Sequence, residues 1–193
     1  RTLAARVASA LIAALLLAGA LASGADAQAQ TYPSRPVKIL IGFPPGGPSD
    51  TSTRLVAEEL AKALGQPFVI EAKPGAGGNI AAETVARAAP DGYTLFAANS
   101  GALGVNPSLY SSLPFDAVKD FAPITMMVVT PMIVMTPADN PARTISDLIG
   151  AMRTRGQEMN YGTPGIGTLP HITGEALKAA VKGASAHVAY RGT

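Results

Sequence analysis

The chain alternates between short apolar runs and stretches in which apolar residues recur every three or four positions. Residues 37–43 (VKILIGF) are β-branched and apolar, which is typical of a strand buried on both faces. After them, Val56, Leu60 and Leu64 lie four apart, as on one face of a helix. We expect strands at 37–43, 67–73 and 93–98 and helices at 51–64 and 79–89. This order predicts a parallel sheet with right-handed crossovers.

Residues at the ends of these elements resemble helix starts and stops. Ser49 or Asp50 is a suitable N-cap for the first helix, and Asn79 is one for the second. Gly65 stands where the first helix needs a glycine after its C-terminus.

The pattern changes beyond Ser100, and we place a lobe boundary there. Residues 122–137 (APITMMVVTPMIVMTP) are apolar but contain Pro131, which cannot donate within a ladder. We therefore expect two short strands or one bent strand in this segment. The first lobe is expected at 31–101, and the second, incomplete, at 102–193.

The second half also carries recognisable elements. Residues 144–155 predict a helix capped by Thr144. Residues 159–181 predict a strand, a glycine-rich turn and a helix, and the strand that starts near residue 186 ends in another turn.

The first 30 residues have the three parts of a secretory signal. Arg1 and Arg6 precede an apolar stretch from 7 to about 22, and residues 25–27 (ADA) fit an A-x-A cleavage site. The alternative is a transmembrane anchor, for which this stretch is short. We expect a cleaved signal peptide at 1–27 and a periplasmic protein.

Composition removes several classes of function. Fifteen basic and thirteen acidic residues give a net charge of +2 and form no runs, so nothing predicts a nucleic-acid partner. There are no cysteines, which excludes disulfide partners, thiolate nucleophiles and cysteine-ligated metals. We expect no cofactor and no metal.

Three turns between a strand and a helix are rich in glycine: PPGGPSD, PGAGGNI and GTPGIGTLPH. Ligands of open parallel sheets lie beyond the carboxyl ends of the strands, and a helix start offers unpaired N–H groups. Such turns suit a carboxylate or a phosphate. The alternative is that each turn serves chain geometry alone, and Asp50 is open to both a capping and a binding role.

Nucleotide-binding and catalytic motifs fail on spacing. No Gly-Lys pair is followed by Ser or Thr, so there is no P-loop. No G-x-S-x-G elbow surrounds Ser100. A hydrolase acting on an acidic substrate would have to use Ser100, Asp50 and His171, while His187 is expected to serve packing in a strand.

Four segments, in order, resemble one family. YPSRPVKILIGFPPGGPSD, KPGAGGNIAAETVARAAPDGYTLF, YGTPGIGTLPHITGEAL and VAYRGT are similar to the substrate-binding proteins of tripartite tricarboxylate transporters, the TctC or Bug family. The resemblance covers Tyr32 to Thr193. It implies a two-lobed α/β periplasmic-binding-protein fold of type II, with parallel or mixed sheets flanked by helices. It also implies a small organic carboxylate ligand and membrane permease subunits as partners.

The resemblance also implies ligand-binding residues, which lie in four loops and a last turn. These are Pro45, Gly46, Gly47 and Asp50; Gly77, Gly78 and Asn79; Ser100; Thr163, Gly165, Gly167, Thr168 and His171; and Tyr190, Arg191 and Gly192. Chains of the family continue beyond the last turn, so this one is expected to be C-terminally truncated. A carboxylate sensor that docks on a receptor is a further alternative to transport.

Overall fold

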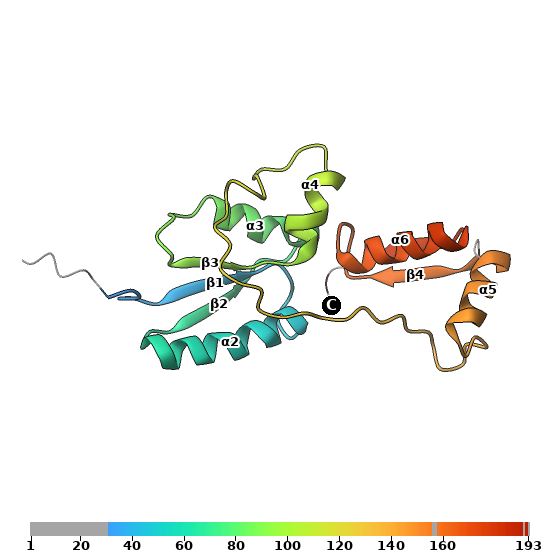
Figure 1. The fold of residues 1–193 in the computed structure, drawn as a ribbon, viewed down its shortest axis with the longest axis horizontal. Helices are drawn as coiled ribbons and strands as arrows, with labels where there is room; N and C mark the ends of the chain where they lie inside the picture. Colours follow the sequence, from blue (N-terminus) through green and yellow to red (C-terminus); the bar gives the residue numbers. More distant parts are fainter. Residues whose placement is uncertain (1–30, 156–157, 191, 193) are drawn as a thin grey trace, which may run out of the picture. The chain divides into compact units, whose positions relative to one another are not determined.

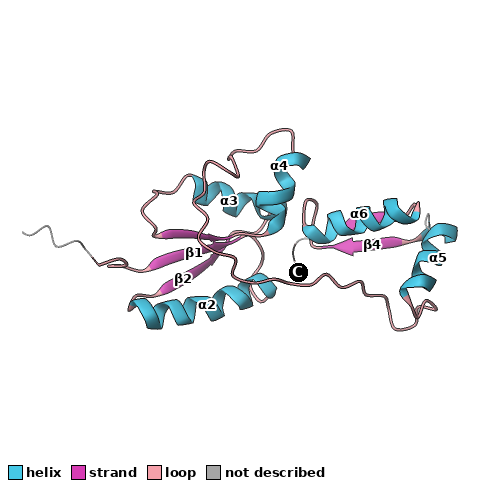
Figure 2. Ribbon diagram, in the orientation of Figure 1, coloured by secondary structure: helices cyan, strands magenta, loops and turns pink. Residues whose placement is uncertain are grey.

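The part of the chain that the structure describes contains two small parallel sheets, each flanked by helices (Figures 1 and 2). This computed structural model describes residues 31–155, 158–190 and 192. The predicted signal peptide, at 1–27, lies outside the described residues. The elements are β1 (Val37–Ile41), α2 (Pro48–Leu64), β2 (Phe68–Ala72), η1 (Ala76–Gly78), α3 (Asn79–Ala86), β3 (Thr94–Ala97), η2 (Gly101–Val105), α4 (Asn106–Leu109), α5 (Ile145–Arg155), β4 (Asn160–Thr163), α6 (Leu169–Val181) and β5 (Ala186–Ala189).

The first sheet has the strand order β2-β1-β3, and all its pairings are parallel. Ile41 at the end of β1 is in register with Ala72 of β2 and Ala97 of β3. The carboxyl ends of all three strands therefore meet at one edge, and the loops that follow them leave from that edge. Because β1 is flanked on both sides, its apolar side chains are almost completely buried, as the sequence predicted.

Apolar side chains pack on both faces of this sheet. On one face, Ile39 and Ile41 of β1 lie in a cluster with Ala57 of α2. On the other face, Phe96 of β3 packs in a second cluster with Ala82 of α3. Strand residues alternate between the faces, so helices on both sides complete the core.

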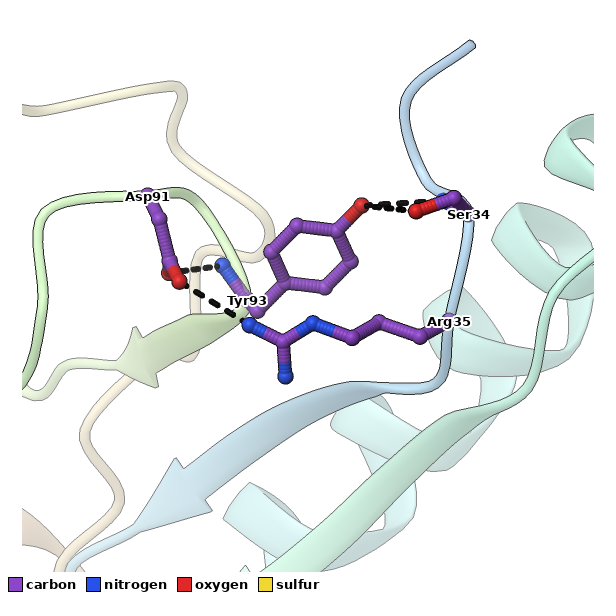
Figure 3. A network of polar contacts seen from close by, with 4 residues as sticks. All are labelled: Ser34, Arg35, Asp91 and Tyr93. Carbon is purple, nitrogen blue, oxygen red and sulfur yellow. Dashed lines mark hydrogen bonds and ion pairs between the residues drawn. The ribbon is translucent and has the colours of Figure 1, made fainter. Parts of the chain in front are cut away.

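A polar network holds the amino end of the first sheet (Figure 3). The guanidinium of Arg35 lies 3.9 Å from the centre of the Tyr93 ring and pairs with Asp91 Oδ2 at 2.9 Å. The Ser34 N–H donates to the Tyr93 hydroxyl at 2.9 Å, and the Tyr93 N–H donates to Asp91 Oδ1 at 3.0 Å. These contacts fasten the chain before β1 to the turn before β3.

The second sheet pairs β4 with β5 in parallel, and α6 connects the two strands. Helix α5 precedes β4 and begins with a capping box. The Asp147 N–H donates to Thr144 Oγ1 at 3.2 Å, and the Thr144 N–H donates to Asp147 Oδ2 at 2.9 Å. The predicted cap at Thr144 is thus confirmed, whereas the lobe boundary between 101 and 102 stays a prediction.

One predicted element does not form. Residues 122–137 carry no strand, and every one of them is exposed. The segment has prolines at 123, 131 and 137, each without an N–H for a ladder, and no strand of the described residues pairs with it. β-Branched composition favours a strand only where a partner strand is present.

Two predicted caps are also wrong. Helix α2 starts at Pro48 with Gly47 as N-cap, which places Ser49 and Asp50 inside the helix. Helix α3 has Gly78 as N-cap, and Asn79 is its first residue. Gly65 does end α2, with φ of 71° and its N–H donated to the Ala61 carbonyl. Within 31–155, 158–190 and 192, no helix is both long enough and apolar enough to cross a membrane.

Candidate functional site

Asp50 holds the first loop closed rather than pointing at solvent. The residue is 4% exposed, and its Oδ2 accepts the Gly46 N–H at 2.9 Å. Arg54, one turn later, donates its Nε to the same oxygen at 3.0 Å and places Nη2 2.9 Å from Oδ1. The hydrogen bond from Arg54, followed by that from Gly46, lowers the pKa of the Asp50 carboxyl. Asp50 is therefore ionised and already paired.

The start of α2 keeps donors open. Within the described part of the chain, no hydrogen bond engages the N–H groups of Gly47, Ser49 and Asp50. Pro45 and Pro48 have no N–H to offer. Because these groups stand at the positive end of a helix of 17 residues, they suit an anionic group.

The N–H groups of two predicted residues in the second loop are engaged internally. The Gly78 N–H donates to the Gly75 carbonyl at 2.9 Å, and the Asn79 N–H donates to the Ala76 carbonyl. Gly78 has φ of 103°, which glycine adopts without strain. A Cβ on Gly42 would lie 2.6 Å from the Gly78 Cα, so the first and second loops are in contact. The second loop therefore provides close backbone contacts with its neighbours more than free N–H groups.

Two asparagines that were not predicted follow β3, Asn99 just after the strand and Asn106 at the start of α4. Asn99 Oδ1 accepts the Ala102 N–H at 2.9 Å, and Asn106 donates its Nδ2 to Asn79 Oδ1 at 2.6 Å. Ser100, which was predicted, is exposed between them and caps η2 through its backbone alone. An asparagine directly after a strand was the available signal for Asn99, whereas Asn106 follows a stretch without clear periodicity.

The fourth loop, 163–168, is braced by its own threonines. Thr168 donates its Oγ1 to the Gly165 carbonyl at 2.7 Å, and the Gly165 N–H lies 3.3 Å from Thr163 Oγ1. The Gly167 N–H donates to His171 Nδ1 over 3.4 Å. At the start of α6, the N–H groups of Leu169 and His171 have no hydrogen bond within the described residues. This loop thus ends, like the first, in open donors at a helix start.

Close approaches connect the loops with one another. A Cβ on Gly77 would lie 2.9 Å from the Ile166 carbonyl oxygen, and one on Gly101 would lie 2.6 Å from the Gly167 carbonyl oxygen. In the last turn, a Cβ on Gly192 would lie 2.5 Å from Pro44 Cδ. The predicted loops therefore meet backbone to backbone, with room for little more than glycine at each contact.

Tyr190 and Arg191 complete the predicted set. Tyr190 donates its N–H to the Thr163 carbonyl at 2.8 Å, and Tyr190 is 64% exposed. Arg191 lies outside the described residues.

Comparison with known proteins identifies the family. The family model TctC, the tripartite tricarboxylate transporter family receptor, matches residues 52–193. This chain belongs to that family. A UPF0065 protein of Bordetella bronchiseptica is 41% identical over 151 residues, which are 78% of this chain and 44% of the relative. The chain thus spans about half the length of the curated relatives it matches.

Solved structures of periplasmic binding proteins have the same fold as this chain. The periplasmic binding protein BugD has a TM-score of 0.78 and 34% identity over 84% of this TctC chain and 54% of its own. MatC from Rhodopseudomonas palustris with bound malate has a TM-score of 0.77 and 33% identity, over 83% of this chain and 55% of its own. R. palustris Rpa4515 with adipate has a TM-score of 0.73 and 32% identity, over 83% of this chain and 54% of its own. The predicted family and the predicted α/β fold class are both confirmed.

The residues of the hydrolase alternative are not joined in this TctC chain. Asp50 is paired with Arg54. No hydrogen bond among the described residues links Ser100 to His171. His171 instead lies against His187, with ring centres 4.2 Å apart. In the described part of the chain, no three His, Cys, Asp or Glu gather as a metal site would require.

A groove of about 450 Å³ borders the fourth loop of this TctC chain, because Thr163 is among its lining residues. It is bordered by residues 132–137, by β4 and by α6, and its lining is mainly apolar. Apolar side chains offer no donor to a carboxylate, so the open N–H groups at the starts of α2 and α6 remain the candidate carboxylate site.

The second sheet carries a titratable cluster around His187. His187 Nε2 lies 2.6 Å from Thr163 Oγ1, and its ring stacks on Tyr161 and His171. Tyr161 donates its hydroxyl to Glu175, which also pairs with Lys178. Burial of His187, followed by the charge of His171, lowers the His187 pKa. Burial also raises the Tyr161 pKa, with help from Glu175.

We expect the stability of the protein to fall as the pH drops below about 6.5, the ordinary histidine pKa. With the folded-state pKa of His187 below that value, the unfolded chain binds the proton more readily. The stabilisation present above the unfolded pKa is therefore lost as the pH falls through the folded pKa. Thermal unfolding between pH 8 and pH 5 should show this decline, and His187→Gln should reduce it. An equal decline in the wild type and the variant would contradict the assignment to His187.

Proposed function

We propose that the protein captures a small dicarboxylate in the periplasm and presents it to the membrane permease subunits of a tripartite tricarboxylate-type transporter. The observation that carries the proposal is the pair of open helix starts. Helices α2 and α6 each begin with N–H groups that no described residue engages, and each is preceded by a glycine loop. The second loop contacts both the residue that leads into the first loop and the fourth loop, which brings the two helix starts to one site in this proposal.

Main-chain donors fit the chemistry of a carboxylate. N–H groups that meet an ionised oxygen form charge-assisted hydrogen bonds, and each helix start adds about 0.3–1 kcal/mol through its dipole. The one buried carboxylate in the first loop, Asp50, is paired with Arg54 and offers little repulsion. A ligand with an acid at each end would use one helix start for each.

The comparisons support the same substrate class. MatC holds malate and Rpa4515 holds adipate, which are both dicarboxylates. The N-terminal sequence supports export, and the family's receptors include the periplasmic binding protein BugD. Closure of the loops around the acid would remove it from water and form the surface that a permease recognises.

Titration of the full-length protein by calorimetry tests the proposal. Malate and adipate should release heat, whereas malamide and adipamide, which have the same carbon chains without charge, should not. At about 100 times the Kd, a bound acid should raise the free energy of unfolding by about 2.7 kcal/mol. Ser100→Ala should bind nearly as well as the wild type. The absence of both heat and a thermal shift with every acid would contradict the proposal.

A further inference from the structure

Asn106 is a buried amide that joins two segments far apart in the sequence. It is the first residue of α4 and has an exposed fraction of 0%. Its Nδ2 donates to Asn79 Oδ1 at 2.6 Å. Asn79 is itself 6% exposed and opens α3, directly after the second glycine loop. One end of the Asn106 amide is thus fixed to the second loop.

The other end of this amide faces the fourth loop. A Cβ on Gly167 would collide with Asn106 Oδ1 and would lie 3.1 Å from its Cγ. The backbone of Gly167 therefore passes against the Asn106 side chain. Gly77, in the second loop, makes the neighbouring approach to Ile166, so Asn106 lies beside the point where the two loops meet.

The Asn106 oxygen has no donor. Among the described residues, Asn106 Oδ1 is buried and accepts no hydrogen bond. Buried acceptors are rarely left unpaired, because burial without a partner is unfavourable. The fourth loop contains a weakly engaged donor, since the Gly167 N–H reaches His171 Nδ1 only at 3.4 Å. An apolar side chain could fill the same space, so the amide indicates a role beyond packing.

We propose that Asn106 is a positioning residue that holds the second and fourth loops together around the ligand, with its free oxygen accepting a hydrogen bond from the fourth loop when ligand is bound. Because the residue is completely buried, it sets the approach of the loops without touching the ligand. This inference rests on the proposed function, since it assigns a role within the same site.

A double-mutant cycle between Asn106 and Gly167 in the full-length protein tests this role. Asn106→Ala should weaken malate or adipate binding by about tenfold, and Gly167→Ala by at least as much. The alanine methyl at 167 collides with the Asn106 side chain, so truncating Asn106 makes room for it. The double variant should therefore bind about as well as the weaker single variant, instead of showing the product of both losses.

Further readouts separate positioning from a loss of fold. Binding is measured well below the unfolding midpoint of each variant, and Asn106→Ala should raise the dissociation rate while the association rate stays nearly unchanged. Asn160→Ala, at an exposed asparagine of β4, is the matched control and should change affinity less than twofold. Losses that multiply in the double variant, or an unchanged dissociation rate in Asn106→Ala, would overturn the proposal.

The same variants distinguish a failure of this inference from a failure of the proposed function. A wild type that binds none of the acids overturns the proposed function and the role of Asn106 in binding. Coupling between the two substitutions in thermal unfolding then decides whether the Asn106–Gly167 contact exists. Additive unfolding effects would show that the contact is absent.

Discussion

Replacing Gly78 by alanine should lower the free energy of unfolding by about 2–5 kcal/mol. Gly78 is buried with φ of 103°, and a left-handed backbone costs alanine about 1–2 kcal/mol. The new Cβ would also lie 2.5 Å from Asn99 Nδ2 and 3.5 Å from Ala102 Cβ, and such overpacking typically costs about 1–3 kcal/mol more. Denaturant unfolding measures the loss of stability. Calorimetry with malate or adipate should show weaker binding, because the second loop would be displaced.

Gly150→Ala is the matched control for this substitution. Gly150 lies within α5, has an ordinary helical backbone, and a Cβ there would meet nothing within 4 Å. Alanine should therefore raise the stability by about 0.5–1 kcal/mol. If Gly78→Ala and Gly150→Ala had similar effects, the close contact at the second loop would be refuted.

Ile41→Ala should lower the free energy of unfolding by about 2–5 kcal/mol, and Ile41→Val by about 0.5–1.5 kcal/mol. Ile41 is completely buried at the end of the central strand and packs with Ala57 and Ala97. Its side chain faces the core and not the loops, so well below the unfolding temperature the affinity for a carboxylate should change little. This separates it from Gly78→Ala, in which stability and binding should fall together.

Val69→Ala supplies the comparison on the neighbouring strand. Val69 is 53% exposed on β2, and its truncation should cost less than about 0.5 kcal/mol. Equal losses of stability at positions 41 and 69 would contradict the placement of β1 at the centre of the sheet.

The pattern of apolar residues was sufficient for most of the fold. A β-branched run such as 37–41 and a stripe such as Val56, Leu60 and Leu64 carry their own periodicity, and glycine at 65 marks a helix end by its backbone freedom. Such local patterns predict an element without reference to any other part of the fold. Residues 122–137 have the composition of strands too, but a strand requires a neighbour, which composition cannot supply.

The candidate site was predictable at the level of loops but not of individual groups. The glycine turns do lie at the strand ends and meet one another. Which N–H groups stay open depends on pairings within each turn. Gly46 donates to Asp50 and Gly78 to Gly75, whereas Ser49 and Leu169, which were not among the predicted residues, keep open donors. The role proposed for Asn106 depends on its contact with Gly167, which is 61 residues later in the sequence (167 − 106), and no local pattern predicts such a contact.

The network of Ser34, Arg35, Asp91 and Tyr93 has a practical consequence for measuring binding. It fixes the start of β1 at the amino edge of a parallel sheet, and five strand residues, about 16 Å, separate that edge from the first loop. A biosensor surface coupled just ahead of Pro33 would therefore hold the protein by the edge farthest from the glycine turns. Immobilisation there should leave ligand access unhindered, whereas coupling through Lys73, which follows β2 beside the second turn, should obstruct it.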